Sequence, residues 1–251
     1  MIETAQATGT VPASAARLES VSKLFGAFAA LRKVTVDFPV GSSTMVLGDN
    51  GAGKSTMLRL IAGLIAPSRG TVQVFSGEPR DQRFRIAYMS HEPMLYDEMS
   101  AMENLRYFSA LHRSGDDACG CSGSPEMALR AVGLDPHLAR PVGQYSQGMR
   151  QRASLARVLQ ADPELLLLDE PFSNLDVESA RHMVELLRDF RTWPAGSGTA
   201  SSSGFQRTII LTTHQAHLAE PLADTVLTMR SGSIASIESL VSNKAQAGLR
   251  P

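Results

Sequence analysis

The chain has 251 residues, a length that suits one large domain or two closely packed ones and is enough to bury a proper hydrophobic core. Its 24 basic and 25 acidic residues give a net charge of -1, which offers no support for electrostatic binding of nucleic acid or of anionic lipid. Apolar residues make up 43% of the chain, but no apolar run approaches the roughly eighteen residues that a membrane-spanning helix needs. We therefore expect a globular domain that does not itself cross a membrane.

The N-terminal part is expected to contain a loose tail followed by antiparallel strands. Residues 1–16 have neither an early basic cluster nor an apolar run, so they lack the features of a secretion signal. Further along, Val34, Val36 and Phe38 alternate with polar residues, and residues 71–75 show the same alternation. Such alternation is typical of half-exposed strands, so this region predicts a small antiparallel β subdomain.

Short apolar runs bounded by turn or charged residues predict the strands of a central sheet. They lie at residues 43–47, 85–89, 165–168 and 208–211. Because helical stretches separate them, we expect buried parallel strands in an α/β core. Residues 192–204, which are rich in Gly and Ser, are expected to form a flexible surface loop.

The segment between the second and third of these strands has the pattern of helices. They are expected at residues 101–111, 126–132 and 148–160. We interpret residues 92–159 as a helical subdomain inserted into an α/β core. That core spans residues 17–91 and 160–251, so residues 17–251 are expected to form a single domain.

Residues 48–55 match the pattern G-x-x-x-x-G-K-S/T, directly after the strand at 43–47 and before a helical run at 57–66. The glycines allow backbone N–H groups to surround phosphate oxygens, Lys54 can reach the β and γ phosphates, and the Ser55 hydroxyl can bind magnesium. The pattern therefore predicts a phosphate-binding loop. Its expected contacts to a nucleotide come from Gly48, Asn50, Gly51, Ala52, Gly53, Lys54, Ser55 and Thr56.

The apolar strand at 165–168 ends in two carboxylates, Asp169 and Glu170. At the end of a buried strand, Asp169 can hold magnesium through water, and Glu170 can orient or deprotonate an attacking water. Taken alone, the same residues can be a strand that runs into a solvated acidic turn. The phosphate-binding loop earlier in the chain favours the catalytic interpretation.

A second helix start also has the features of an anion site. In residues 145–149, Ser146 can cap free N–H groups, and the helix dipole adds to their attraction for an anion. Without the other motifs, we would favour the interpretation of Ser146 as a simple helix cap and of Arg150 and Arg152 as a solvated basic face.

In their order along the chain, these motifs resemble those of the nucleotide-binding subunit of an ABC transporter. Residues 145–149 are similar to the family's signature, and residues 173–176 are similar to its D-loop. His214 stands at the position of the switch histidine, although it can also be a structural histidine. Phe25 stands where the family stacks an aromatic ring on adenine, although such a residue can also belong to the core. The resemblance runs from about residue 17 to residue 234.

The resemblance implies a P-loop NTPase fold with a RecA-like core, ATP and Mg2+ as cofactors, and ATP hydrolysis as the activity. It implies catalytic roles for Lys54, Glu170 and His214, with magnesium held by Ser55 and Asp169. Glu170 would polarise the attacking water, and His214 would steady the γ phosphate.

The family resemblance also implies that two subunits pair head to tail. The partner is expected to be a second copy or a paralogous ATPase subunit. Ser146, Gln147 and Gly148 would then contact the ATP held by the partner, and Asn174 and Asp176 would lie at the dimer contact.

One position departs from the family pattern. His91 stands where the family normally has the glutamine that contacts magnesium and the attacking water. A neutral imidazole can accept a hydrogen bond or bind the metal in a similar way, so His91 is a candidate catalytic and metal-binding residue. An imidazolium would repel the metal, and histidine ordinarily titrates at about pH 6.5. We therefore expect turnover to fall as the pH drops through that region.

The family resemblance further implies a membrane permease as partner and a location on the cytoplasmic face of the cell membrane. Residues 88–102 are rich in Met and aromatic residues, which adapt to a partner helix, and the family's permease docks there. The form of the signature is similar to that of exporters whose permeases are separate chains. His91 and residues 102–108 are similar to haem-exporter subunits of cytochrome c maturation and also to drug and polysaccharide exporters.

A competing interpretation is a soluble ABC ATPase that acts in translation or DNA repair. Translation-type members usually carry two such cassettes in one chain, and this chain shows one. Repair-type members separate their motifs with long heptad coils, whereas 92 positions without such a run separate Lys54 from Ser146. Both comparisons favour the transporter subunit.

The only two cysteines, Cys119 and Cys121, lie in a segment rich in Gly and Ser. Together with His112 or His137 they can supply metal ligands. A zinc site normally has a second pair of ligands of this kind, so we interpret the segment as a flexible loop.

Overall fold

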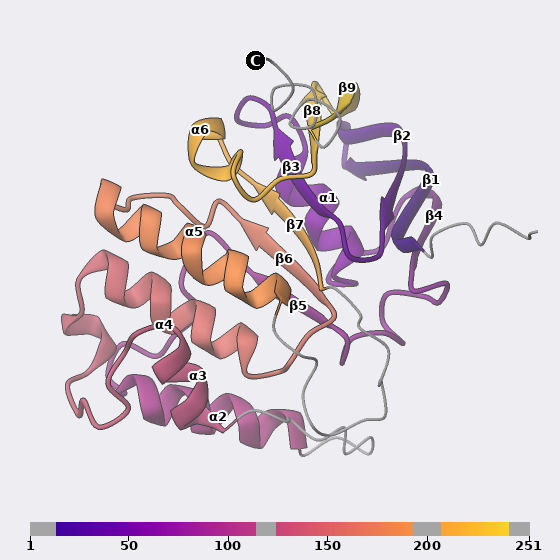
Figure 1. Ribbon diagram of the computed structural model, residues 1–251. Coiled ribbons are helices and arrows are strands. Elements are labelled where there is room, and N and C mark those ends of the chain that lie inside the picture. The colour runs from indigo at the N-terminus through magenta and orange to yellow at the C-terminus, as the bar shows by residue number, and fades with distance from the viewer. Residues whose placement is uncertain (1–13, 114–123, 193–206, 241–251) are drawn as a thin grey trace, which may run out of the picture.

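The computed structural model describes residues 14–113, 124–192 and 207–240 (Figure 1). Cys119, Cys121 and the expected loop at 192–204, apart from Thr192, lie outside these residues. Within the described parts, no helix is long and apolar enough to cross a lipid bilayer.

A three-stranded antiparallel sheet forms near the N-terminus. Its strands, in spatial order, are β2 (Phe28–Pro39), β1 (Ser14–Phe25) and β4 (Arg69–Val74). Val34, Val36 and Phe38 are buried, and polar residues alternate with them, which confirms the expected half-exposed strands. The expectation of a tail up to residue 16 is wrong for its last residues. β1 already begins at Ser14, because Ala16 pairs with both Phe38 and Val74.

The central sheet has six strands. In spatial order they are β5 (Ile86–Met89), β6 (Leu165–Asp169), β7 (Thr208–Thr212), β3 (Ser43–Leu47), β8 (Thr225–Arg230) and β9 (Ser233–Ser239). The first five are parallel, and β9 pairs with β8 in the antiparallel sense. The four predicted core strands are therefore confirmed as parallel neighbours.

Each face of the central sheet is covered, which explains why β6 is apolar at four successive positions. Leu165 and Leu167 belong to the core cluster on one side, and Leu166 and Leu168 to the cluster on the other. A strand buried on both faces needs apolar residues at every position. Burial of each such leucine side chain contributes about 1.5–3 kcal/mol.

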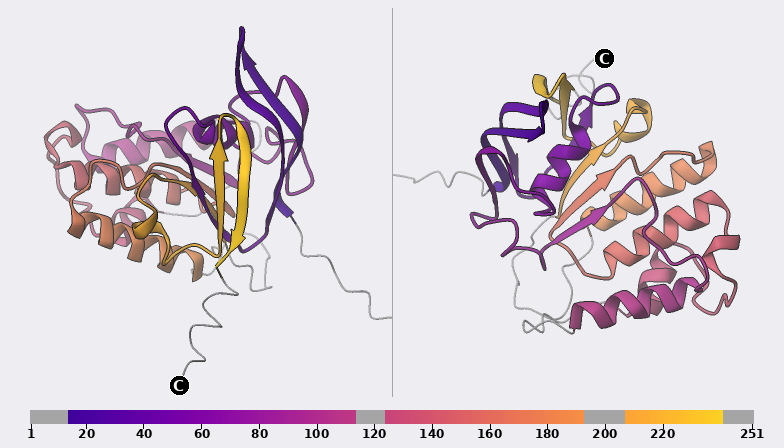
Figure 2. Two further views of the ribbon diagram at one scale, coloured as in Figure 1. Left: turned by 90° about the horizontal axis from the view of Figure 1, so that it is seen from above. Right: turned by 180° about the vertical axis from the view of Figure 1, so that it is seen from behind.

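Helix α1 (Lys54–Ile61) packs between the two sheets, as the view from behind in Figure 2 shows. Met57, Leu58 and Ile61 share one core cluster with residues of both sheets. The predicted helix at 57–66 is displaced. The chain enters the helix at the phosphate-binding loop and leaves it before Gly63, whose φ of 70° lies in the left-handed region.

The remaining helices are α2 (Ala101–Arg113), α3 (Pro125–Ala131), α4 (Gln147–Leu159), α5 (Val177–Thr192) and the short α6 (Ala216–Ala219), with a 3-10 turn at Val142–Gln144. Of these helices, α4, α5 and α6 lie on the opposite side of the central sheet, and α2 and α3 pack against α4 (Figure 1). The three helices expected between residues 92 and 159 are all present. The architecture confirms the expected α/β class, with an antiparallel N-terminal sheet beside a RecA-like core.

Candidate functional site

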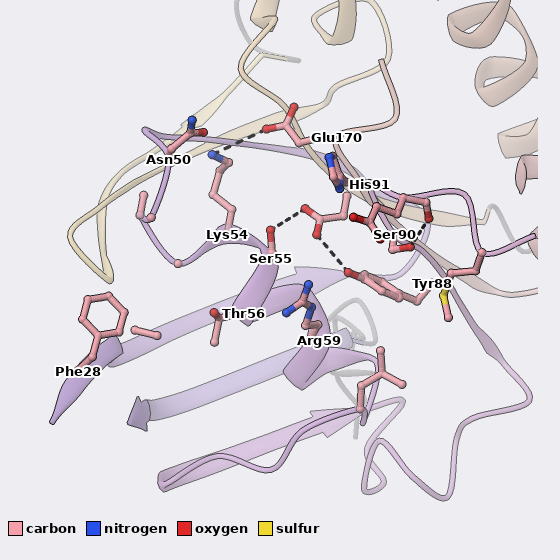
Figure 3. Close-up of a pocket in the computed structure, with 18 residues that line it drawn as sticks. Phe28, Asn50, Lys54, Ser55, Thr56, Arg59, Tyr88, Ser90, His91 and Glu170 are labelled. Atoms are coloured by element: carbon pink, nitrogen blue, oxygen red, sulfur yellow. Dashed lines mark hydrogen bonds and ion pairs between the residues drawn. The ribbon is translucent and has the colours of Figure 1, made fainter. Parts of the chain in front are cut away.

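A cleft of about 670 Å³ opens where the carboxyl end of β6 faces the start of α1. Because carboxyl ends of parallel strands meet at one edge of a sheet, this is the expected place for a ligand. Figure 3 shows the side chains that surround the cleft. They include Phe28, Asn50, Lys54, Ser55, Thr56, Arg59, Tyr88, Ser90, His91, Asp169 and Glu170.

The phosphate-binding loop folds into the cleft through glycines in the left-handed region. Gly48, Gly51 and Gly53 have φ values of 147°, 79° and 101°. A Cβ on Gly48 would lie 2.4 Å from the carbonyl oxygen of Met229, and one on Gly53 would lie 2.6 Å from that of Ala30. Close packing of the backbone therefore excludes side chains at these two positions.

The start of α1 is suited to an anion. Gly53 is its N-cap and supplies no side-chain hydrogen bond to the first turn. The first N–H groups of a helix have no partner within the helix, and the helix dipole makes that end positive. This end of α1 can therefore bind phosphate oxygens.

Lys54 is held at the mouth of the loop. Its Nζ donates to the carbonyl oxygens of Gly48 at 2.7 Å and Asp49 at 3.2 Å. The same atom lies 3.8 Å from Glu170 Oε1, and the side chain is buried. The ammonium group thus lies between the loop and the catalytic carboxylate predicted from the sequence.

Asp169 and Ser55 come together across the cleft. Ser55 Oγ donates to Asp169 Oδ1 at 2.9 Å, and Thr212 Oγ1 donates to the same oxygen at 2.7 Å. Tyr88 Oη donates to Asp169 Oδ2 at 3.1 Å. Burial and the neighbouring Asp169 raise the pKa of Tyr88 to about 12, so the phenol keeps its proton.

The pair of Ser55 and Asp169 fits a magnesium ion. Both supply oxygen donors beside the phosphate-binding loop, and Mg2+ in nucleotide sites takes one or two protein oxygens together with phosphates and waters. The described part of the chain contains no cluster of three or more His, Cys, Asp or Glu side chains around a common point. A metal here would thus depend on a bound nucleotide for its other ligands.

Glu170 follows β6 in a strained backbone conformation. Its φ is 53°, which is uncommon outside glycine and asparagine. The conformation is held because the Glu170 N–H donates to Thr212 Oγ1 at 3.0 Å. The carboxylate lies against the end of β7, where Oε2 is 2.9 Å from His214 Nδ1. The structure thus brings Glu170, His214 and Lys54 together.

His91 lines the same cleft and is exposed to solvent. Its side chain lies in the region that Ser55 and Asp169 also line, so a role toward the metal or the attacking water stays a prediction. Ser90 and Glu92 flank it, and Ser90 Oγ donates to the Glu92 carbonyl oxygen at 2.6 Å, which shapes the turn after β5.

Phe28 lines the cleft, as Tyr88 does, and Phe25 is the partner of Phe28 across the turn between β1 and β2. Phe25 is half exposed and has Lys23 Nζ 5.1 Å from its ring centre, so it is not a core residue. Its predicted stacking on adenine stays a prediction. Sequence reasoning missed Phe28, whose position three residues after Phe25 in the hairpin was the available signal.

Ser146 caps α4, because its Oγ accepts a hydrogen bond from the Met149 N–H at 3.3 Å. Ser146, Gln147 and Gly148 are not among the residues that line the cleft. The cap is compatible with both interpretations of Ser146. It leaves the predicted contact with a second subunit untested.

The predicted D-loop lies between β6 and α5. Asn174 is in the left-handed region, with φ of 59°. Asp176 Oδ1 accepts a hydrogen bond from the Ser179 N–H at 2.7 Å and so caps α5. Hydrogen bonds from Ser179 lower the pKa of Asp176, as expected for a carboxylate at a helix start. Their predicted part in a dimer contact stays a prediction.

A comparison with known protein families matches the part of the chain that carries the phosphate-binding loop and the two carboxylates. A family model described as ABC transporter matches residues 31–173, more than half of the chain. The chain belongs to the ABC transporter family. An AAA-domain model, described as a putative AbiEii toxin of a type IV TA system, also matches residues 135–220 of this ABC ATPase.

Relatives of this ABC ATPase cover most of its length. The ABC transporter ATP-binding protein NatA of Bacillus subtilis is 32% identical over 228 residues, which cover 88% of this chain and 87% of that protein. A fluoroquinolones export ATP-binding protein of Mycobacterium tuberculosis is 36% identical, over 81% of this chain and 64% of that protein. The molybdenum import ATP-binding protein ModC of the same species is 35% identical, over 82% and 56%.

Solved structures share the fold of this ABC ATPase. An ATP-binding subunit of an ABC transporter superposes with a TM-score of 0.72 at 26% identity, over 94% of this chain and 95% of that one. A dimeric ATP-binding cassette in a post-hydrolysis state with ADP and Pi gives a TM-score of 0.73 at 24% identity. The family match and the relatives, together with this shared fold, identify the chain as an ATP-hydrolysing subunit of the ABC transporter type.

Proposed function

We propose that this ABC ATPase powers export through a separate membrane permease. ATP binding closes a pair of subunits, and hydrolysis reopens it. The observation that carries the ATP-hydrolysis part of the proposal is the meeting of Lys54, Glu170 and His214 at the phosphate-binding loop. This set of residues combines a cation for the phosphates with a carboxylate for the attacking water.

The phosphate-binding loop and α1 grip the nucleotide in this scheme. The N–H groups at the start of α1 and the Lys54 ammonium hold the β and γ phosphates. Ser55 and Asp169, with His91 as a further candidate, would hold a magnesium ion, which supplies positive charge to the phosphates. Phe25, or Phe28 beside it, would stack on the adenine.

Glu170 acts as the general base of the proposed reaction. Its carboxylate accepts a proton from the attacking water, and His214 steadies the γ phosphate. His214 Nδ1 lies 2.9 Å from Glu170 Oε2, so the two side chains are near enough to act on the same water and phosphate. The buried Lys54 ammonium lies 3.8 Å from Oε1 of this base.

The site is completed by a second subunit in this proposal. Ser146, Gln147 and Gly148 would contact the γ phosphate held by the partner, and Asn174 and Asp176 would line the dimer contact. Support comes from their absence among the cleft-lining residues and from the dimeric form of a neighbour with the same fold. The start of α4 remains an anion-binding end that its own chain's cleft does not use.

The permease would dock near residues 88–102, on the cytoplasmic face of the membrane. Met94 and Tyr96 are exposed apolar residues in this segment, as a docking surface requires. Relatives include both export and import proteins. Export therefore rests on the form of the signature, and haem remains one candidate substrate beside drugs and polysaccharides.

Glu170→Gln tests the proposed chemistry. The variant is expected to bind ATP, to hydrolyse it about 10²- to 10⁴-fold more slowly, and to elute as a dimer with ATP in size-exclusion chromatography. Glu185→Gln makes the same change of charge on an exposed face of α5 and is the control. Near-parent hydrolysis by Glu170→Gln would refute the assignment of the base.

Co-purification tests the coupling to transport. The tagged chain is expected to carry an integral membrane permease with it from detergent-solubilised membranes. Recovery with ribosomes or DNA instead would favour the alternative, a soluble ABC ATPase of translation or repair.

A further inference from the structure

Tyr88 belongs to the site although the sequence placed it elsewhere. It was expected to begin the permease-docking segment. In the structure its hydroxyl reaches Asp169 Oδ2 at 3.1 Å, from the edge strand β5 to the neighbouring strand β6 (Figure 3). The side chain is half-buried and lines the cleft together with Lys54 and Ser55.

Three hydroxyl groups from three different elements hold the carboxylate of Asp169. Ser55 and Thr212 both donate to Oδ1, and Tyr88 donates to Oδ2. A carboxylate has about four acceptor positions, two on each oxygen. Of these three contacts, that of Tyr88 alone fixes Oδ2, and one acceptor position on that oxygen is left for a further donor.

Arg59 is a positively charged neighbour of the Tyr88 hydroxyl. Its side chain, on α1, lies beside the phenol in the cleft (Figure 3). A guanidinium group carries only donors, so its charge repels the phenol hydrogen and favours donation from Tyr88 to Asp169. Arg59, Tyr88 and Asp169 thus lie next to one another and come from α1, β5 and β6.

We infer that Tyr88 is a positioning residue for Asp169, and that it tightens the binding of a divalent cation to the nucleotide site. The inference rests on the proposed role of Asp169 toward magnesium. The hydrogen bond from Tyr88 to Oδ2 fixes the plane of the Asp169 carboxylate. The acceptor position that remains free on Oδ2 therefore points in one direction. Groups that orient a metal-binding carboxylate commonly change metal affinity by about 10- to 100-fold.

Tyr88→Phe tests the inference, because it removes one hydroxyl and leaves the ring in place. Binding of Mn2+ in the presence of ADP is measured by electron paramagnetic resonance, and binding of ADP alone is measured in EDTA. The half-saturating Mn2+ concentration is expected to rise by about tenfold. ADP affinity in EDTA is expected to stay within about twofold, since neither the loop nor Lys54 is changed. If Tyr88 only supported the fold, Tyr88→Phe would weaken both the binding of Mn2+ and the binding of ADP in EDTA.

Tyr107→Phe is the matched control, because Tyr107 lies on α2 and packs edge-on against Tyr96 with ring centres 5.1 Å apart. It is expected to bind Mn2+ like the parent. Asp169→Asn distinguishes a failure of the proposed metal site from a failure of the role assigned to Tyr88. If Asp169→Asn kept the parent Mn2+ affinity, the proposed metal site would be wrong.

If Asp169→Asn weakened Mn2+ binding and Tyr88→Phe did not, the role of Tyr88 would be overturned while the metal site stood. Arg59→Gln removes the charge beside the phenol and keeps the test decisive should Tyr88→Phe fail to fold. It is expected to raise the half-saturating Mn2+ concentration by about two- to fivefold, less than Tyr88→Phe, because the hydroxyl itself stays in place. An unchanged value in Arg59→Gln would contradict the proposed orientation of the Tyr88 hydroxyl toward Asp169.

Discussion

His214 approaches Glu170 through two atoms. Its ring nitrogen Nδ1 lies 2.9 Å from Glu170 Oε2, and its backbone N–H donates to the same oxygen at 3.2 Å. The end of β7 thus holds the carboxylate that follows β6. Because the ring of His214 is more than half exposed, it can turn toward a phosphate while the backbone contact keeps the carboxylate in place.

Replacement of His214 should separate these two contacts. His214→Ala is expected to keep ATP binding and to lower hydrolysis by about 10²-fold, the typical cost of losing one group that stabilises developing charge. His217→Ala, an exposed histidine on the neighbouring α6, is the control and should hydrolyse ATP like the parent. Steady-state phosphate release checks both, and full activity of His214→Ala would count against its proposed role.

Two serines in the chain allow the predicted role of the signature to be separated from helix capping. Ser124 and Ser146 each cap a helix, and each accepts from the N–H three residues later at 3.3 Å. Both Ser→Ala changes are expected to cost about 1 kcal/mol of unfolding free energy. Ser146→Ala should in addition lower ATP hydrolysis at least tenfold, an estimate based on the loss of one charge-stabilising donor. Urea unfolding and ATPase rates check this, and equal activities of the two variants would remove the role in a second subunit's site.

The glycines of the phosphate-binding loop predict unequal costs. A Cβ on Gly53 would lie 2.6 Å from the Ala30 carbonyl oxygen and 2.7 Å from Leu31, whereas one on Gly51 would meet no atom within 4 Å. Gly51→Ala should therefore lower the free energy of unfolding only through the strain of a left-handed alanine, by about 1–2 kcal/mol. Gly53→Ala adds a backbone clash and should cost about 1–3 kcal/mol more. Urea unfolding without nucleotide measures both, and equal stabilities would contradict the packing described here.

Asp97 connects the proposed docking segment to the start of the signature helix. Arg150 Nη2 lies 2.6 Å from Asp97 Oδ1, and the Gly143 N–H donates to the Asp97 carbonyl oxygen at 2.9 Å. In a double-mutant cycle, Asp97→Ala and Arg150→Ala are expected to show a coupling of about 0.5–1 kcal/mol in unfolding free energy, as for a partly exposed ion pair. Additive effects would show that the ion pair does not contribute to stability.

The sequence predicted those parts of the site that are local in the chain. Lys54 and Ser55 follow a strand and begin a helix, and Asp169 and Glu170 end a strand, so spacing and composition are enough to find them. The same holds for the core strands, since a strand covered on both faces must be apolar throughout.

The residues that sequence reasoning missed depend on which strands are neighbours. Tyr88 and Thr212 reach Asp169 only because β5 and β7 lie on either side of β6. The local pattern of residues 86–89 does not predict the order of the strands in the sheet. The sequence pattern wrongly predicts a tail at Ala16 for the same reason, because the burial of Ala16 comes from pairing with β2 and β4, far along the chain.

The backbone at Glu170 has a consequence for how the protein can change over time. At a φ of 53°, glycine or asparagine in place of Glu170 would stabilise the folded state by about 1–2 kcal/mol. Selection for stability alone would therefore replace Glu170 and remove the proposed general base. A library randomised at position 170 can be selected once for thermal stability and once for growth that depends on transport. The first selection should therefore enrich glycine or asparagine, and the second should enrich glutamate. The fold thus accepts a left-handed backbone conformation at the point where the proposed chemistry needs a carboxylate.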